Sequence, residues 1–169
     1  MVVVKINKDK REITSALTHL GGAVFGLIGM IMLLYVAVQS KNTMSIIAFI
    51  IFGLSMILLY STSSIYHFID ASKKKAKLVM RKLDHIMIFV LISGTYTPIC
   101  LLVLKNTLGN ILLSIVWGIT LIGIFIKLFW INAPRWVSSG LYIGMGWISV
   151  FVMSPLIKSM PIGGVVWLF

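Results

Sequence analysis

The apolar residues of the chain gather into long continuous runs, separated by short stretches that carry most of the charge. An α-helix rises about 1.5 Å per residue, so roughly 20 apolar residues are needed to cross about 30 Å of hydrocarbon. Continuous runs favour helices over the alternating strands of a membrane barrel. The pattern predicts an all-α, polytopic membrane bundle with spans at Ala16–Val38, Met44–Tyr66, Ile86–Leu104, Ile111–Ile131 and Trp136–Met153.

A sixth apolar run begins at Gly163 and reaches the last residue, Phe169. A helix of this length extends only about 10 Å, which is too short to cross a bilayer. We therefore predict five spans and the start of a sixth. All of them belong to one integral membrane domain that comprises residues 1–169.

The composition supports a membrane protein. The chain is 59% hydrophobic and only 11% charged, whereas soluble domains are about a quarter charged. The net charge of +11 comes from basic clusters between the apolar runs, so we expect no nucleic-acid partner. The one cysteine, Cys100, lies within an apolar run and has no partner for an intrachain disulfide.

Lysine and arginine collect at alternate ends of the predicted spans. One set of ends carries twelve of the fifteen, in residues 1–15, in a basic loop at 69–83 and around the end of the fourth span. The opposite set carries only Lys41, Lys105 and Lys158. Cytoplasmic loops are enriched in Lys and Arg. This distribution predicts a multi-pass protein of the cell membrane with a cytoplasmic N-terminal segment 1–15 and a cytoplasmic loop 69–83.

Polar residues mark the end of the second span and the beginning of the third. His67 and Asp84 should reach the same depth, because the second span ends on the side where the third begins. Ionisable residues at membrane depth are functional-site hypotheses by default. Ser63 precedes His67 by one helical turn, so both lie on one face.

Each of these residues also has a structural interpretation. His67 could contact lipid headgroups at the interface, and Asp84 could cap the N-terminus of the third span. Ser63 could bond back to the carbonyl group four residues earlier. The spacing alone leaves both interpretations open.

Glycine pairs and a proline predict local backbone features. Gly22 with Gly26, and Gly140 with Gly144, have the small-xxx-small spacing that lets helices approach closely. Pro98 removes a helical hydrogen bond, so we expect a kink there.

Four stretches resemble the hemolysin III family, the bacterial relatives of the progestin and adipoQ receptors. They are "REITSALTHLGG", "SSIYHF", "LDHIMIFVLISGTYTP" and "LYIGMGW", which occur in order between Arg11 and Trp147. The third is the most specific. The resemblance implies a seven-helix bundle with a cytoplasmic N-terminus and a zinc ion near the cytoplasmic side.

The resemblance also implies roles for the polar residues. His67 would be a zinc ligand, Asp84 would contact the metal-bound water as a catalytic residue, and Ser63 would belong to the same catalytic cluster. The family takes two further zinc-binding histidines from an H-x-x-x-H pair on its seventh helix. Because the sequence stops at Phe169, we expect a C-terminally truncated chain with an incomplete zinc site.

Three functions are consistent with these residues. The first is a zinc-dependent hydrolase acting on a lipid amide or a related membrane substrate, with membrane lipids as partners. The second is a lytic or pore-forming protein, as the family name suggests. The third is a membrane sensor or receptor, which would need the same cavity as a hydrolase.

Overall fold

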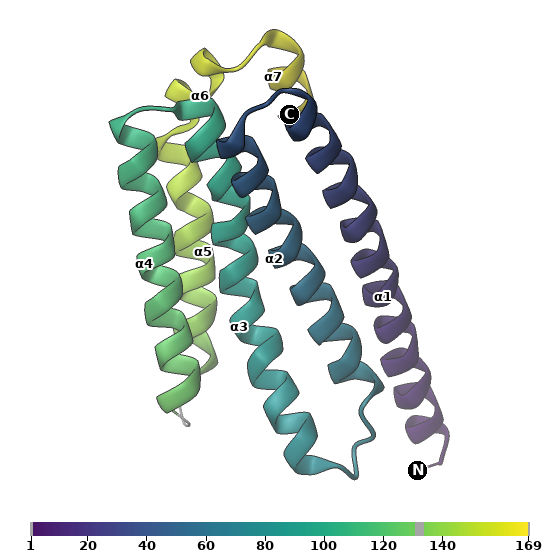
Figure 1. Ribbon diagram of the computed structural model, residues 1–169. Helices are drawn as coiled ribbons and strands as arrows, with labels where there is room; N and C mark the ends of the chain where they lie inside the picture. Colours follow the sequence, from purple (N-terminus) through teal and green to yellow (C-terminus); the bar gives the residue numbers. More distant parts are fainter. Residues whose placement is uncertain (1, 131–133, 169) are drawn as a thin grey trace.

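The computed structural model describes residues 2–130 and 134–168, and within them it contains helices and no strands (Figure 1). The prediction of an all-α membrane bundle is confirmed. In chain order the elements are α1 (Val2–Gln39), α2 (Thr43–Phe68), α3 (Lys74–Pro98), the π-helix η1 (Ile99–Leu104), α4 (Thr107–Phe129), α5 (Arg135–Phe151), α6 (Met153–Ser159) and α7 (Ile162–Leu168).

Consecutive long helices run antiparallel, and each packs against its neighbour in the chain (Figure 1). α1 packs on α2, α2 on α3, and α3 on α4, while α5 contacts both α3 and α4. The start of α1, residues 69–73, the end of α4 and the start of α5 therefore lie at one end of the bundle (Figure 1). We call this the basic end, because the predicted Lys and Arg clusters belong to it. Residues 40–42, 105–106 and 152–161 lie at the other end.

Four continuous helical segments are long and apolar enough to cross a membrane: Lys10–Gln39, Thr43–Phe68, Lys74–Leu104 and Thr107–Phe129. The fifth predicted span corresponds to α5, which is followed by α6 after a bend of 53°. Pro155 accounts for the break, because it cannot donate a hydrogen bond to the carbonyl group of Phe151 and its ring crowds that group. α7 covers most of the sixth apolar run.

The predicted basic loop at 69–83 is wrong in its extent. α3 begins at Lys74, so only residues 69–73 connect α2 to α3. The sequence from Lys74 to Leu83 is rich in Lys, Leu and Arg, which are good helix formers. Its backbone continues the helix beyond the apolar run instead of forming a loop.

Hydroxyl groups join the helices inside the bundle. Ser93 of α3 donates to the carbonyl group of Val116 on α4 at 3.0 Å and lies 2.6 Å from the hydroxyl of Thr120. Tyr96 of α3 donates to the carbonyl group of Met145 on α5 at 2.7 Å. Lipid gives little hydrophobic drive for helix association, so packing and such hydrogen bonds hold membrane helices together.

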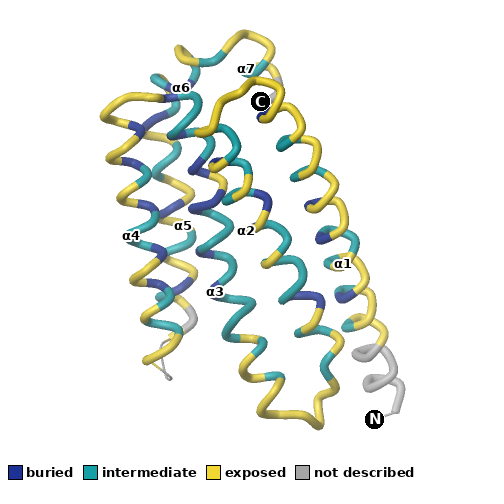
Figure 2. Tube along the Cα trace, in the orientation of Figure 1, coloured by how far each residue is buried: buried dark blue, intermediate teal, exposed yellow. Residues whose placement is uncertain are grey.

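Large apolar side chains cover the outward faces of the helices, where Figure 2 shows mainly exposed positions. Phe25 on α1, Phe125 on α4 and Phe151 on α5 are 76%, 64% and 83% exposed. Side chains of this kind would be costly in water but suit contact with lipid tails. The exposed surface thus agrees with a bundle whose solvent is the bilayer.

The glycine predictions are half correct. A Cβ atom at Gly22 would lie 2.9 Å from the Tyr60 ring, and one at Gly26 would lie 3.2 Å from the sulfur of Met56. This pair lets α1 approach α2, as predicted. A Cβ atom at Gly140 or Gly144 would meet nothing within 4 Å among the described residues, so close approach at that pair is wrong.

Pro98 ends α3 and is followed directly by the π-helix η1. Proline removes a backbone donor from the helical ladder, and the chain changes its hydrogen-bond spacing at this point. The hydroxyl of Thr97 donates to the carbonyl group of Ser93 at 2.8 Å. The expected kink therefore takes the form of a change in helix type.

Gly123 of α4 supplies a test of this packing. A Cβ atom there would lie 2.6 Å from the ring of Phe89, which is only 1% exposed. We expect Gly123→Ala to destabilise the protein by about 1–3 kcal/mol through overpacking. Gly118→Ala is the matched control, because a Cβ atom there would meet no other described part of the protein within 4 Å. Thermal unfolding in detergent measures both; equal stability of the two variants would contradict the packing of α3 on α4.

Candidate functional site

The Glu12 carboxylate on α1 makes ionic contacts with two other helices at the basic end. Its Oε2 atom lies 3.1 Å from Nδ1 of His67 on α2 and 3.3 Å from Nζ of Lys77 on α3. Each of the three side chains is 31% exposed or less. Lys77 also donates to the carbonyl group of Ile69 at 3.4 Å. One carboxylate thus ties α1, α2 and α3 together.

The contact with Glu12 determines which nitrogen of His67 carries a proton. An ionised carboxylate can only accept hydrogen bonds, so Nδ1 must be the donor. In the neutral ring this leaves the lone pair of Nε2 unprotonated. The ring is thus prepared to bind a cation, or to accept a proton, at Nε2.

His19 of α1 stacks on His67. The ring centroids are 5.5 Å apart and the planes differ by only 8°. Tyr66 packs edge-on against the same His67 ring, with the centroids 5.0 Å apart. The Nδ1 atom of His19 is buried and has no hydrogen-bond partner in the described part of the chain. Glu12, His19, His67 and Lys77 together form what we call the Glu12 cluster.

The structure places two of the predicted site residues, Ser63 and His67, on α2 and the third, Asp84, on α3. His67 is in the Glu12 cluster, and Ser63 lies buried one turn earlier on the same helix. Asp84 is half-buried on α3. In the described residues, the carboxylate that contacts His67 belongs to Glu12 and not to Asp84.

The neighbouring serine, Ser64, joins α2 to α1. Its hydroxyl donates to the carbonyl group of Ala16 at 2.8 Å and is buried. Thr62 instead bonds back to the carbonyl group of Leu58 in its own helix, at 2.7 Å. Of the hydroxyl groups before His67, that of Ser64 therefore joins α2 to α1, and that of Thr62 bonds within α2.

Zinc fits this site only in part. The described residues contain no group of three or more His, Cys, Asp or Glu side chains arranged to hold a metal ion. The His19 and His67 rings are almost parallel, and an imidazole lone pair lies in the plane of its ring. Two stacked rings cannot direct their lone pairs to one ion. His67 fits as a single ligand through Nε2, since a carboxylate bound to the other nitrogen is typical of metal-ligating histidines.

Sequence reasoning alone does not single out Glu12 or His19 as site residues. The signal was present in their spacing, because positions 12 and 19 are separated by two helical turns and share one face. Glu12 precedes the apolar run by a few residues and so falls in the predicted cytoplasmic segment 1–15. Only the packing of α1 against α2 shows that this face is turned inward.

Comparison with known proteins gives consistent matches. The family model described as "Haemolysin-III related" matches residues 7–169. The "Hemolysin-3 homolog" of Bacillus subtilis (strain 168) is 39% identical over 160 residues, which cover 95% of this chain and 74% of that protein. "Hemolysin-3" of Bacillus cereus is 36% identical over 151 residues, covering 89% of this chain and 68% of that protein. No solved structure matches the chain.

The contact between Glu12 and His67 can be measured by a double-mutant cycle. We expect Glu12→Ala and His67→Ala to be coupled by about 0.5–1.5 kcal/mol in the free energy of unfolding, because each removes the other's partner. Glu12→Ala combined with Thr62→Ala is the control, since Thr62 bonds within its own helix. Unfolding in mixed micelles measures both cycles. If the Glu12–His67 coupling does not exceed that of the control pair, the contact does not hold α1 to α2.

Proposed function

The chain belongs to the haemolysin-III related family, and from this premise we propose that it is a zinc-dependent hydrolase acting on a lipid amide or a related membrane substrate. The observation that carries the proposal is the pairing of His67 with Glu12. A half-buried imidazole, fixed by a carboxylate at one nitrogen, is the arrangement expected of a metal ligand.

The residues of the Glu12 cluster have separate roles in this proposal. His67 would bind zinc through Nε2. Glu12 would hold the ring in the required tautomer and orientation, and Lys77 would in turn hold Glu12 by its ionic contact of 3.3 Å. Catalytic zinc sites usually have three protein ligands, and the described residues supply no such group. His67 is therefore proposed as one ligand of the site.

Zinc, when bound, would supply Lewis-acid activation of water and of the substrate carbonyl group. Asp84 is proposed to orient the attacking water and take its proton. Ser63, buried one turn from His67, is proposed to donate a hydrogen bond within the reacting cluster. The exposed apolar faces of the helices suit a substrate that arrives with acyl tails in the bilayer.

We further propose that the protein lies in the cell membrane with its N-terminus in the cytoplasm. The support is the charge distribution, because the basic end carries twelve of the fifteen Lys and Arg residues. The Glu12 cluster would then face the cytoplasmic leaflet. Membrane lipids are the partners that this placement provides.

A lytic activity is the second candidate, and the names of two relatives favour it. The proteins of Bacillus subtilis and Bacillus cereus are called a hemolysin-3 homolog and hemolysin-3. A hydrolase could also lyse cells indirectly, by changing the lipids of their membranes. The two functions differ in whether leakage requires lipid products.

Proteoliposomes that contain a fluorescent short-chain ceramide and a trapped dye test both functions. We expect fatty acid release that stops on chelation, returns with zinc and is abolished by His67→Ala. Glu12→Ala should lower the rate about 10- to 100-fold, the usual cost of losing a carboxylate behind a metal-binding histidine. The zinc content of the purified protein should be lower in Glu12→Ala than in the unaltered protein, and lowest in His67→Ala.

Thr62→Ala serves as the control, since this hydroxyl bonds only within α2; turnover and zinc content should be unchanged. Turnover that is indifferent to chelation or to His67→Ala would exclude the proposed mechanism. Dye leakage without lipid products would favour the lytic function instead.

A further inference from the structure

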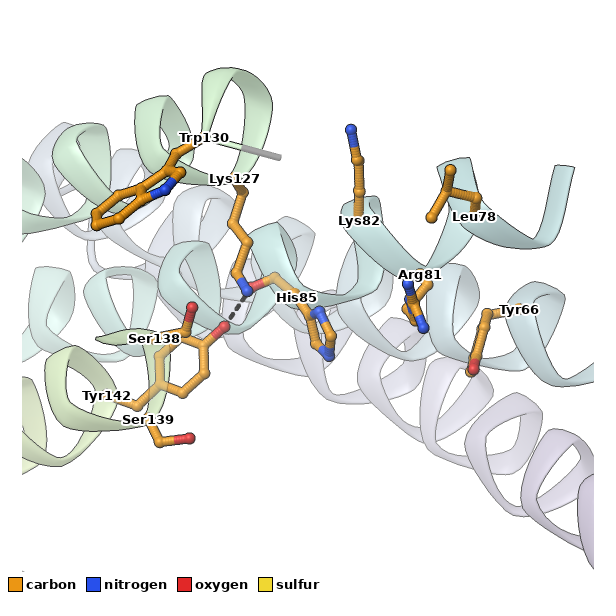
Figure 3. Close-up of a pocket in the computed structure, with 10 residues that line it drawn as sticks. All are labelled: Tyr66, Leu78, Arg81, Lys82, His85, Lys127, Trp130, Ser138, Ser139 and Tyr142. Atoms are coloured by element: carbon orange, nitrogen blue, oxygen red, sulfur yellow. Dashed lines mark hydrogen bonds between the residues drawn. The ribbon is translucent and has the colours of Figure 1, made fainter. Parts of the chain in front are cut away.

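A cavity of about 500 Å³ opens at the basic end between the ends of α3, α4 and α5 (Figure 3). Volumes of this size are typical of small-ligand sites. Among the described residues that line it, three carry lysine or arginine side chains and none is acidic. The basic residues are Arg81, Lys82 and Lys127, and hydroxyl groups come from Ser138 and Tyr142.

Ser138 is a buried donor in this cavity that lacks a partner. The residue is only 4% exposed, and its Oγ atom has no hydrogen-bond partner in the described part of the chain. Helical hydroxyls usually bond to the carbonyl group four residues earlier, as Thr95 and Ser114 do here. A buried polar group without a partner is costly, so Ser138 points to a ligand that accepts a hydrogen bond.

The cavity lies beside the first turns of α5. Ser138 and Ser139 are in the first turns of this helix, and Pro134 at its N-cap supplies no side-chain hydrogen bond to the free N–H groups. Unsatisfied N–H groups and the helix dipole favour an anion at such an end. Three basic side chains and a buried hydroxyl that has no partner among the described residues therefore line one cavity beside the first turns of α5.

We propose that this cavity binds a phosphate group, carried by an anionic lipid or by free phosphate. Arg and Lys side chains bind phosphate oxygens by charge-assisted hydrogen bonds, and the hydroxyl of Ser138 would donate a further one. The cavity is lined mainly from α3, α4 and α5, with Tyr66 of α2 at its edge, whereas the Glu12 cluster is formed by residues of α1, α2 and Lys77 of α3. The proposal is thus independent of zinc and of hydrolysis.

Orientation in the membrane and helix dipoles do not account for this arrangement. Lys127 is in the last turn of α4, where a cation stabilises the helix end. That role does not explain why Arg81 and Lys82 of another helix line the same cavity, or why Ser138 is buried beside them. Basic cavities between membrane helices on the cytoplasmic side are known sites for anionic headgroups.

The aromatic lining favours a lipid as the source of the phosphate. Trp130 and Tyr66 line the cavity, and such side chains concentrate at the headgroup level of membranes. A second hollow, of about 270 Å³, shares Tyr66, Leu78 and Arg81 with the first and adds Lys74 and Lys77 to the lining. A headgroup at this position would be surrounded by positive charge while its acyl tails remained in the bilayer.

Equilibrium dialysis of radiolabelled dioctanoyl phosphatidylglycerol against the protein in neutral detergent tests the proposal. We expect saturable binding that is not displaced by dioctanoylglycerol, which has the same tails without the phosphate. Inorganic phosphate is the second competitor: displacement at the same concentrations as unlabelled lipid assigns the site to free phosphate, and weaker or no displacement assigns it to the lipid headgroup.

Variants of the lining residues distinguish specific binding of the anionic lipid in the cavity from its non-specific electrostatic attraction to the basic surface. Arg81→Gln and Lys127→Gln should each weaken binding about tenfold or more, and Ser138→Ala about two- to tenfold. Lys75→Gln is the matched control, because Lys75 is exposed, lies in the same basic stretch and lines neither cavity; it should change binding less than about twofold.

Ser138→Ala leaves the charge of the protein unchanged and removes one hydroxyl that has no hydrogen-bond partner among the described residues. The test therefore stays informative if a charge variant fails to fold. Equal effects of Lys75→Gln and Lys127→Gln would overturn the proposal, as would full displacement by dioctanoylglycerol. Binding that stays unchanged in both single variants, Ser138→Ala and Lys127→Gln, would overturn it as well.

Discussion

The carboxylate of Glu12 is the interaction on which the arrangement of the basic end depends. It is a charged group at the edge of an apolar helix, and burying it without partners would be expensive. The imidazole of His67 and the ammonium group of Lys77 supply those partners from two other helices. Because α1 packs mainly on α2, this contact and the hydrogen bond from Ser64 to Ala16 fix the depth at which α1 lies against its neighbour.

The same contact gives the site its chemical character. A histidine at the end of a membrane helix can simply face headgroups, and nothing in its sequence position prevents that. Here the ring is enclosed by His19 on one face and the edge of Tyr66, with its Nδ1 bound to Glu12. Tyr66 also lines the basic cavity, and Lys77 lies 5.2 Å from the centre of its ring. The Glu12 cluster and the proposed phosphate site are thus separated by one aromatic side chain.

The number of spans and their alternation could be predicted from sequence, because a bilayer requires continuous apolar helices of fixed length. The close approach at Gly22 and Gly26 was also predictable, since the spacing itself encodes one helical face. The start of α3 at Lys74 could not be predicted in this way. Basic residues outside an apolar run have the same hydropathy whether they continue a helix or form a loop. Gly140 and Gly144 have the right spacing but meet open space, since α5 presents a different face to α3 and α4.

Only one part of the candidate site could be predicted firmly from the sequence, namely a histidine at the end of the second span. His67 stood out because imidazole is rare within an apolar segment, and its position at the end of α2 is confirmed. Its partner could not be chosen, because Glu12 and Asp84 are both carboxylates near the same end and only helix packing decides between them. Ser138 was indistinguishable from any other helical serine until its burial without a hydrogen-bond partner was known.

The protonation state of His67 tests this account most directly. The chain has three histidines, so the ¹⁵N spectrum of histidine-labelled protein in micelles can be assigned with a His67→Gln variant. At alkaline pH and without metal, the account predicts a neutral His67 ring with the proton on Nδ1, and loss of that preference in Glu12→Ala. A ring protonated at Nε2, or one that does not respond to the loss of Glu12, would contradict it.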